Sequence, residues 1–185
     1  MRPAADARPQ PIDPTADPRR LERVFACCFG AGWRTRLEGG GAEPLYIASA
    51  DPDARPHRIV YREDYFSSAL HEVAHWCLAG AARRRLDDYG YWYQPDGRSP
   101  EQQRAFEAVE ARPQALEWIF TDACRVGFHL SADNLDGGSG PSDDFAAAVE
   151  REKHRFLREG LPPRAERFLR ALELEWVAAA AERVA

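Results

Sequence analysis

The segment SSALHEVAHWCLAG, residues 67–80, places two histidines and a carboxylate inside an apolar stretch. His71 and His75 are four residues apart, so on a helix they are neighbours on one face, with Glu72 beside them. In this HExxH pattern both imidazoles bind a metal, and the glutamate can act on a bound water molecule. Burying such groups without partners costs about 1–3 kcal/mol. This cost favours a metal site over the alternative of core histidines bonded to backbone carbonyls.

Two histidines do not complete a typical metal site, so a third ligand is needed. The long metzincin motif would place a third histidine at position 81, but Ala81 stands there, which excludes that variant. The remaining histidines are His57, His129 and His154, and several carboxylates also lie within reach along the chain.

The segment EQQRAFEAVEA, residues 101–111, supplies the best carboxylate. If Ala105, Phe106 and Val109 mark the inward face of a helix, Glu110 lies close to that face and Glu107 points further towards solvent. We therefore predict Glu110 as the third ligand, with His129 as the second candidate. The alternative is that Glu110 only pairs with an arginine such as Arg112. If Glu110 is the ligand and Glu107 points towards solvent, Glu107→Ala should behave almost like the wild type.

A set of two histidines and one carboxylate suits two kinds of chemistry. With Zn²⁺ it resembles the centre of zinc peptidases, in which Glu72 would be the general base that activates water. With Fe²⁺ it resembles the facial triad of non-haem oxygenases, which leaves positions open for O₂ and substrate. Spacing alone does not decide between them.

Composition limits the remaining possibilities. The 185 residues, 44% of them hydrophobic, predict one domain at 19–185, after a flexible lead-in at 1–18 that is rich in Pro, Ala and Asp. A net charge of −5 does not suggest a nucleic-acid binder, and no apolar run reaches the roughly 18 residues of a membrane-spanning helix. The lead-in lacks the apolar core of a signal peptide. The four cysteines form no CxxC pair and are expected to be reduced core thiols.

The elements that must position these residues predict an α+β fold, with a small mixed sheet packed against several helices. We expect strands at 33–39, 44–49 and 58–63, and helices at 19–29, 66–79, 143–159 and 163–183. Asp17 with Pro18, and Ser99 with Pro100 and Gln102, are typical helix starts. Pro113 fits the first turn of a further helix at 113–127, separate from the one that Ser99 begins.

Several long blocks resemble the elongation factor P hydroxylase family. They are HEVAHWCLAGAARRRLDDYGYWYQPDGR, FEAVEARPQALEWIF, ADNLDG, RIVYREDYFSSALHE and EPLYIA, and the similarity runs from about residue 20 to 175. The resemblance implies a bacterial cytoplasmic enzyme that hydroxylates the modified, β-lysylated lysine of translation elongation factor P. It also implies a zincin-like core around the HExxH helix and a metal held by His71, His75 and Glu110.

We accordingly expect a non-haem iron protein-lysine hydroxylase of the monooxygenase type. Its cofactor would be Fe²⁺, although Zn²⁺ or another divalent metal could occupy the site in crystals, and Glu72 would be catalytic without being a ligand. Elongation factor P is the expected partner of a monomer that binds no nucleic acid or membrane. The alternatives are a zinc-dependent hydrolase, either peptidase or endoribonuclease, and a structural metal domain. The sequence carries no dinucleotide or flavin fingerprint.

An aromatic segment near residue 90 is a candidate substrate-binding region. Tyr91, Trp92 and Tyr93 could form a pocket wall that holds an aliphatic or cationic side chain, and Asp96 could pair with an ammonium group. Ordinary packing explains such aromatics equally well, and an aspartate beside a turn is typically a solvated surface group.

Overall fold

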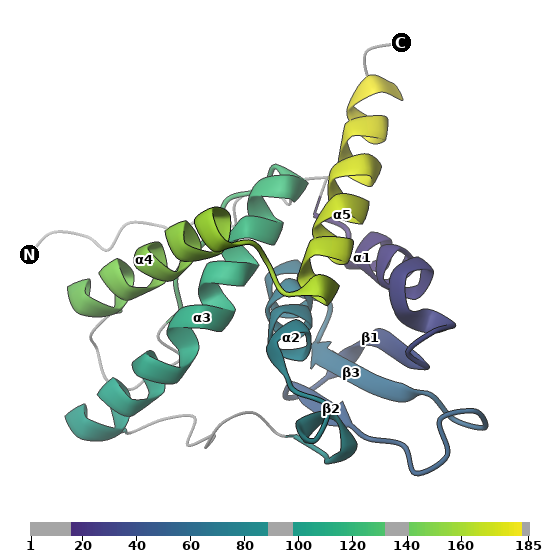
Figure 1. Cartoon of the computed structure of the whole chain (residues 1–185), viewed down its shortest axis with the longest axis horizontal. Coiled ribbons are helices and arrows are strands. Elements are labelled where there is room, and N and C mark those ends of the chain that lie inside the picture. Colours follow the sequence, from purple (N-terminus) through teal and green to yellow (C-terminus); the bar gives the residue numbers. More distant parts are fainter. Residues whose placement is uncertain (1–15, 89–97, 132–140, 183–185) are drawn as a thin grey trace, which may run out of the picture.

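The computed structural model describes residues 16–88, 98–131 and 141–182, and within these ranges it confirms the α+β class. The helices lie together on one side of a small sheet (Figure 1). The helices are α1 (Pro18–Phe25), α2 (Phe66–Leu78), α3 (Pro100–Cys124), α4 (Asp143–Glu159) and α5 (Pro163–Glu182). The strands are β1 (Thr35–Gly41), β2 (Leu45–Ile47) and β3 (His57–Arg62), and two short turns are the π-helical η1 (Ala26–Gly30) and the 3₁₀-helical η2 (Arg83–Arg85).

The sheet is mixed, with β3 in its centre. β1 pairs with β3 in parallel and β2 pairs with it antiparallel, which gives the order β1-β3-β2. The outer side of β2 is partly covered, because Tyr46 forms an isolated antiparallel bridge with Asp88. All three strands lie where the alternating apolar segments predicted them. The zincin-like core implied by the family resemblance stays a prediction.

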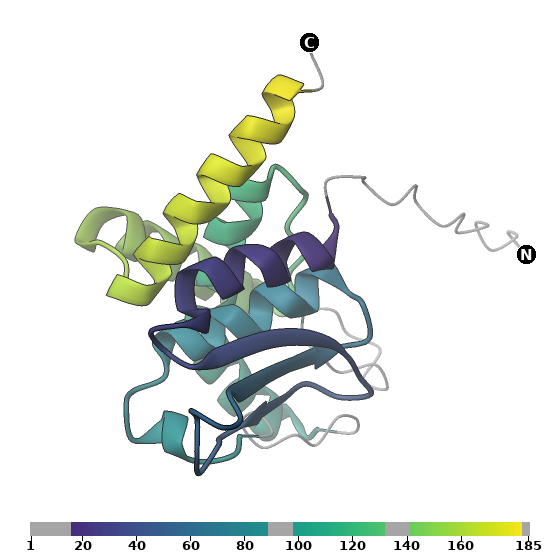
Figure 2. The same ribbon diagram turned by 90° about the vertical axis from the view of Figure 1, so that its right-hand side faces the viewer.

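The histidine-bearing helix α2 lies in the middle of the molecule. It contacts β3 on one side and α3 and α5 on the other, as Figures 1 and 2 show. Its carboxyl end is capped by Arg164 of α5, which donates hydrogen bonds to the carbonyl oxygens of Trp76 and Cys77 at 3.0 and 2.9 Å. A guanidinium at this end also complements the helix dipole. Burial of apolar residues on both sides, together with this cap, holds α2 in place.

Helix α3 is continuous, so the prediction of a helix break before Pro113 was wrong. The proline lies inside α3 and is buried. A proline in a helix interior removes one hydrogen bond and costs about 3 kcal/mol. Extensive packing of α3 against α2, α4 and α5 offsets that cost. The predicted start of α3 is confirmed, because Ser99 and Gln102 form a complete capping box.

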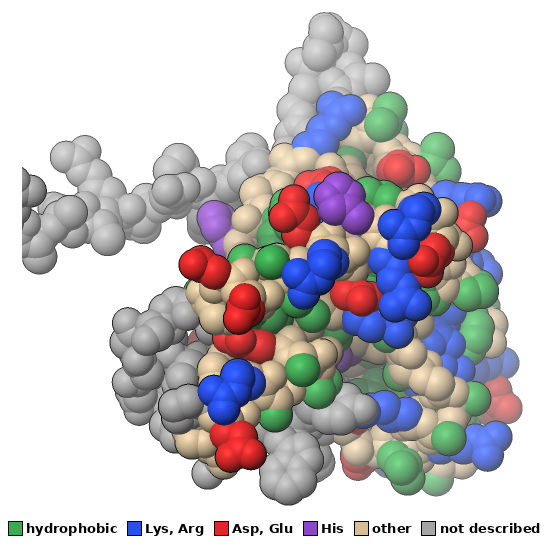
Figure 3. Space-filling view, turned by 60° about the vertical axis from the view of Figure 1, so that its left-hand side comes forward, with side chains coloured by type: hydrophobic (Ala, Val, Ile, Leu, Met, Phe, Trp, Pro, Cys, Tyr) green, Lys and Arg blue, Asp and Glu red, His purple; other side chains and the backbone are tan. Residues whose placement is uncertain are grey.

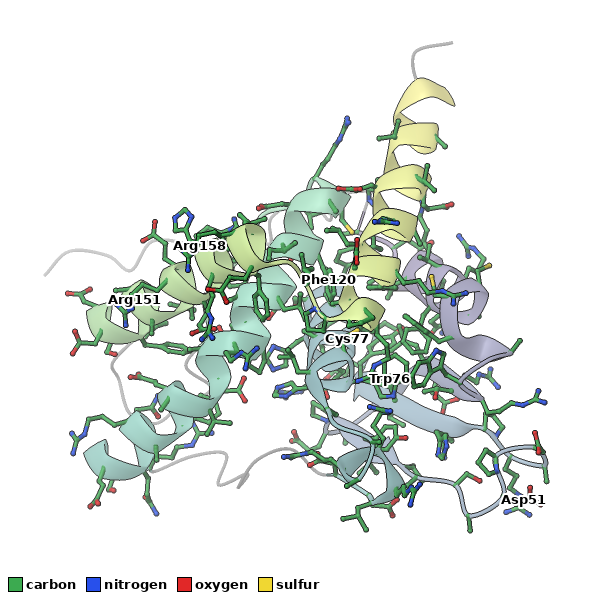
Figure 4. The ribbon with its side chains drawn as sticks, in the orientation of Figure 1. Asp51, Trp76, Cys77, Phe120, Arg151 and Arg158 are labelled. Atoms are coloured by element: carbon green, nitrogen blue, oxygen red, sulfur yellow. The ribbon has the colours of Figure 1, made fainter. Side chains whose placement is uncertain are left out.

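The prediction that all four cysteines are core thiols was also partly wrong. Cys28, Cys77 and Cys124 are buried and Cys27 is exposed, with all four free. Adjacent positions of a helical turn point in different directions, and in η1 it is Cys28 and Phe29 that face the core while Cys27 faces solvent. The core itself lies where α2, α3 and α5 meet, around Trp76, Cys77 and Phe120, whereas Arg151 and Arg158 point outwards from α4 (Figure 4).

Acidic and basic side chains alternate on the face that Figure 3 shows, rather than forming a field of one sign. On α4 several of these charges pair, as Arg155 does with Glu159 at 2.9 Å. Across the part of the chain that the structure describes, no helix combines the length and apolar character needed to span a bilayer.

Candidate metal centre

Three side chains from two helices converge on one point. The Nε2 atoms of His71 and His75, one turn apart on α2, lie 2.9 Å from each other. Glu110 of α3 places its Oε2 atom 3.4 Å from His71 Nε2 and its Oε1 atom 3.4 Å from His75 Nε2. One ligand atom from each residue lies within 4.8 Å of the other two. This is the His-His-Glu set that the sequence predicted.

The cluster fits a cation. Two imidazole nitrogens at 2.9 Å repel each other unless a proton or a metal lies between their lone pairs. The Glu110 side chain is 6% exposed, and no hydrogen bond reaches its Oε2 atom from the residues that the structure describes. A buried carboxylate oxygen without such a bond is costly, and metal coordination would remove that cost.

The protonation of the metal-free cluster supports the same conclusion. Burial alone would lower the pKa of His71, but the close approach of the Glu110 and Glu117 carboxylates outweighs it, and the pKa lies well above its ordinary value. Burial alone would raise the pKa of Glu110, yet the close approach of the His75 and His71 imidazoles holds it well below its usual range. Both shifts favour positive charge between the carboxylates and the imidazoles, so a metal that binds there would compete with protons.

Glu117 is a residue of the site that sequence reasoning missed. Its Oε2 atom lies 2.8 Å from His71 Nδ1, on the side of the ring opposite to Glu110. Because Glu110 and Glu117 are seven residues apart, they lie two turns apart on one face of a continuous helix. That spacing was a usable signal, but the predicted helix break at Pro113 separated the two residues.

Glu72 lines the cleft beside the cluster and is partly exposed. Among the described residues its carboxylate has no hydrogen-bond or ion-pair partner. Burial is the main reason that the pKa of Glu72 is raised, while the neighbouring histidines oppose the rise. Glu72 is therefore a carboxyl group that faces the cleft and has an increased affinity for a proton.

The expected inward face of the 101–111 segment was wrong, although Glu110, the residue it selected, lies beside both histidines. Ala105 and Val109 are exposed, and Glu107, expected near solvent, is 9% exposed. The reason is a second packing surface: Ser142, the N-cap of α4, donates a hydrogen bond to Glu107 Oε2 at 2.7 Å. The amphipathic pattern of one short segment does not reveal that α3 has neighbours on two sides.

The other candidates are not in the cluster. His129 lines the same cleft but is exposed and is not part of the group formed by His71, His75 and Glu110. Four predicted substrate-binding residues lie outside the described residues, namely Tyr91, Trp92, Tyr93 and Asp96.

The cluster opens into a cleft of about 1260 Å³ between α2 and α3. The cleft is also bordered by β2 and η2 and by the segment after α3, so several elements form its walls. A metal held by His71, His75 and Glu110 would have protein on one side and the cleft on the other. Such an arrangement leaves coordination positions accessible, which is typical of catalytic rather than structural sites.

Comparison with known proteins gives two concordant results. Residues 24–183 match the family profile described as Elongation factor P hydroxylase. The chain is also 47% identical over 149 residues to the protein named Elongation factor P lysine hydroxylase of Haemophilus influenzae. That match covers 80% of this chain and 83% of the relative.

Proposed function

Because the chain belongs to the elongation factor P hydroxylase family, we propose that it hydroxylates the modified lysine of elongation factor P with a divalent metal, Fe²⁺, at its centre. The observation that carries the proposal is the convergence of His71, His75 and Glu110 in a chain of this family. The name of the Haemophilus influenzae relative supports both the reaction and the substrate.

The donor set supports iron. Imidazole nitrogens and carboxylate oxygens suit Fe²⁺, and a two-histidine, one-carboxylate set leaves positions open. Bound Fe²⁺ would supply the activation of O₂ that insertion of oxygen into a C–H bond requires. In a monooxygenase reaction one atom of O₂ enters the substrate and the other leaves as water, with a pair of electrons from an external reductant and a pair of protons.

The chain's own residues have separate tasks in this proposal. His71, His75 and Glu110 hold the metal against α2 and α3, and the cleft admits the substrate side chain. We assign to Glu72 the holding and transfer of a proton at its carboxylate, because burial raises its pKa and the carboxylate faces the cleft. Glu72 is not needed as a ligand in this role.

The cleft supports a side chain presented by a protein as the substrate. Its volume is larger than a single lysine side chain needs. An extended, β-lysylated lysine would reach the metal while the rest of the substrate stays outside. Because elongation factor P acts in translation, the reaction would take place in the cytoplasm.

The hydroxylase is favoured over a zinc hydrolase because the matched relative is named a hydroxylase. In a hydrolase Glu72 would be the general base for water attack. The two functions differ in the metal retained by anaerobically purified protein and in the product formed.

The test is to co-express the chain with elongation factor P from the same organism and measure the mass of the modified lysine. The proposal expects the gain of one oxygen atom with the wild type and none with Glu110→Ala, whereas His129→Ala should retain the gain. Retention of zinc together with cleavage of peptide or RNA, and no added oxygen, would support the hydrolase instead.

A further inference from the structure

The two histidines of the centre differ in what orients their rings. His71 Nδ1 lies 2.8 Å from Glu117 Oε2, whereas no hydrogen bond to the Nδ1 atom of His75 is found among the described residues. We propose that Glu117 is a positioning residue, which fixes the tautomer and orientation of His71 and makes His71 the better-oriented of the two imidazole ligands. This inference rests on the metal centre of the proposed function.

The hydrogen-bond geometry gives the tautomer. An ionised carboxylate only accepts hydrogen bonds, so the proton in the contact with Glu117 belongs to Nδ1 of His71. When a metal displaces the proton from the other nitrogen, the ring offers its lone pair at Nε2, the atom that faces His75 and Glu110. Glu117 thereby selects the nitrogen that binds the metal and restricts rotation of the ring.

Charge supports the same assignment. The side chains of Glu110 and Glu117 are 6% and 9% exposed, so two buried carboxylates flank the imidazole of His71. Together the two ionised carboxylates carry a charge equal in magnitude and opposite in sign to that of a divalent cation. Because uncompensated buried charge is costly, Glu117 favours occupation of the centre by a dication.

Glu107 shows that burial of a glutamate on α3 does not by itself create this role. It is 9% exposed, and its carboxylate accepts hydrogen bonds from neutral groups, Ser142 Oγ at 2.7 Å and Gln103 Nε2 at 3.3 Å. Neither of these hydrogen bonds involves His71 or His75. Glu107→Ala is therefore the matched control, because it removes a buried carboxylate of the same helix outside the centre.

The experiment measures the dissociation constant of Co²⁺, a stable probe for Fe²⁺, by competition with a chelator for the full chain and its variants. Loss of a carboxylate that orients a ligand typically costs about 10–100-fold in metal affinity. We expect a loss of that size for Glu117→Ala. A smaller loss is expected for Glu117→Gln, whose amide oxygen still accepts the hydrogen bond from His71 Nδ1. Glu107→Ala should bind Co²⁺ as the wild type does.

A second readout separates positioning from general loosening of the fold. In the Zn²⁺-loaded protein, ¹⁵N chemical shifts of the imidazole rings report which nitrogen carries the proton. The wild type and Glu117→Gln should show the Nδ1–H tautomer for His71. In Glu117→Ala, which lacks the acceptor for that proton, the Nδ1 proton should be less protected from exchange with water.

Two results would overturn the inference while leaving the metal centre intact. One is a wild-type Co²⁺ affinity in Glu117→Ala, and the other is an equal loss of affinity in Glu107→Ala. If the wild-type chain itself binds no dication through His71 and His75, the proposed function fails, and this inference fails with it.

Discussion

Two buried glutamates of α3, Glu107 and Glu110, lie three residues apart and have opposite surroundings. Glu107 accepts one hydrogen bond at each carboxylate oxygen, from the neutral groups of Ser142 and Gln103. Glu110 faces two imidazoles whose nitrogens lie 2.9 Å apart, and its Oε2 atom accepts no hydrogen bond from the described part of the chain. The difference teaches that burial alone does not make a carboxylate a candidate metal ligand, whereas its convergence with other unsatisfied ligand atoms does.

Replacement of Glu110 by alanine should have the largest effect on the metal. The variant leaves the cation with two imidazoles and water. We therefore expect the metal affinity of the protein to fall by more than about 100-fold, which is the upper limit typical for replacing a residue that contacts a ligand but not the metal. Hydroxylation should be lost with the metal, while α2 remains packed and the chain remains folded. Metal content of anaerobically purified protein and circular dichroism check both points.

His129→Ala is the control for that prediction, because His129 lines the cleft without joining the cluster. It should retain metal and activity. Full metal in Glu110→Ala combined with loss of metal in His129→Ala would replace the carboxylate centre by a three-histidine site.

Acidification should weaken metal binding by the next largest amount. The pKa of His71 in the metal-free chain lies well above 6.5, so below that raised pKa a metal must displace a proton from the ring. Apparent affinity should then fall about tenfold per pH unit for each proton displaced, and should level off above the raised pKa. Calorimetric titrations in buffers of different ionisation enthalpy would count the released protons. No proton release at neutral pH would contradict the protonated cluster.

Replacement of Glu107 by alanine should affect the fold and spare the centre. The change removes the hydrogen bond that Ser142 donates, and because Ser142 is exposed to water we expect a cost of about 0.5–1.5 kcal/mol in the free energy of unfolding. This expectation replaces the near-wild-type behaviour predicted from sequence. Chemical denaturation and Co²⁺ titration of the same preparation would measure both properties. Unchanged stability would show that the contacts with Ser142 and Gln103 contribute little.

Glu72→Gln should have the smallest effect on the metal. Its carboxyl group lies beside the cluster and is not a ligand in the proposed function, so iron should stay bound and hydroxylation should fall only partly. Rates of oxygen addition to elongation factor P at matched iron content would test this. Complete loss of hydroxylation with iron retained would instead give Glu72 an essential role.

The sequence predicted the centre better than it predicted the surroundings of the centre. His71 and His75 were identifiable because their four-residue spacing is a property of any helix, and helix ends at Asp17 and Ser99 follow from local capping chemistry. Glu110 does lie beside both histidines, but it was selected from an inward face that the structure contradicts. Local pattern does not encode which neighbours a helix will have.

The error at Pro113 has the same physical origin. Proline disfavours a helix interior locally, but packing of α3 along its length outweighs that preference. Continuity of α3 brings Glu117 onto the face of Glu110 and hence to His71. A long-range property of the fold, rather than a local motif, therefore creates the second carboxylate contact of the centre.

Anomalous diffraction at the iron absorption edge, from crystals grown with Fe²⁺ in the absence of O₂, tests the central claim most directly. The account predicts one strong peak bonded by Nε2 of His71, Nε2 of His75 and the Glu110 carboxylate, with Glu107 still bonded to Ser142. A peak held by His129 in place of Glu110, or no peak between the two histidines, would contradict it.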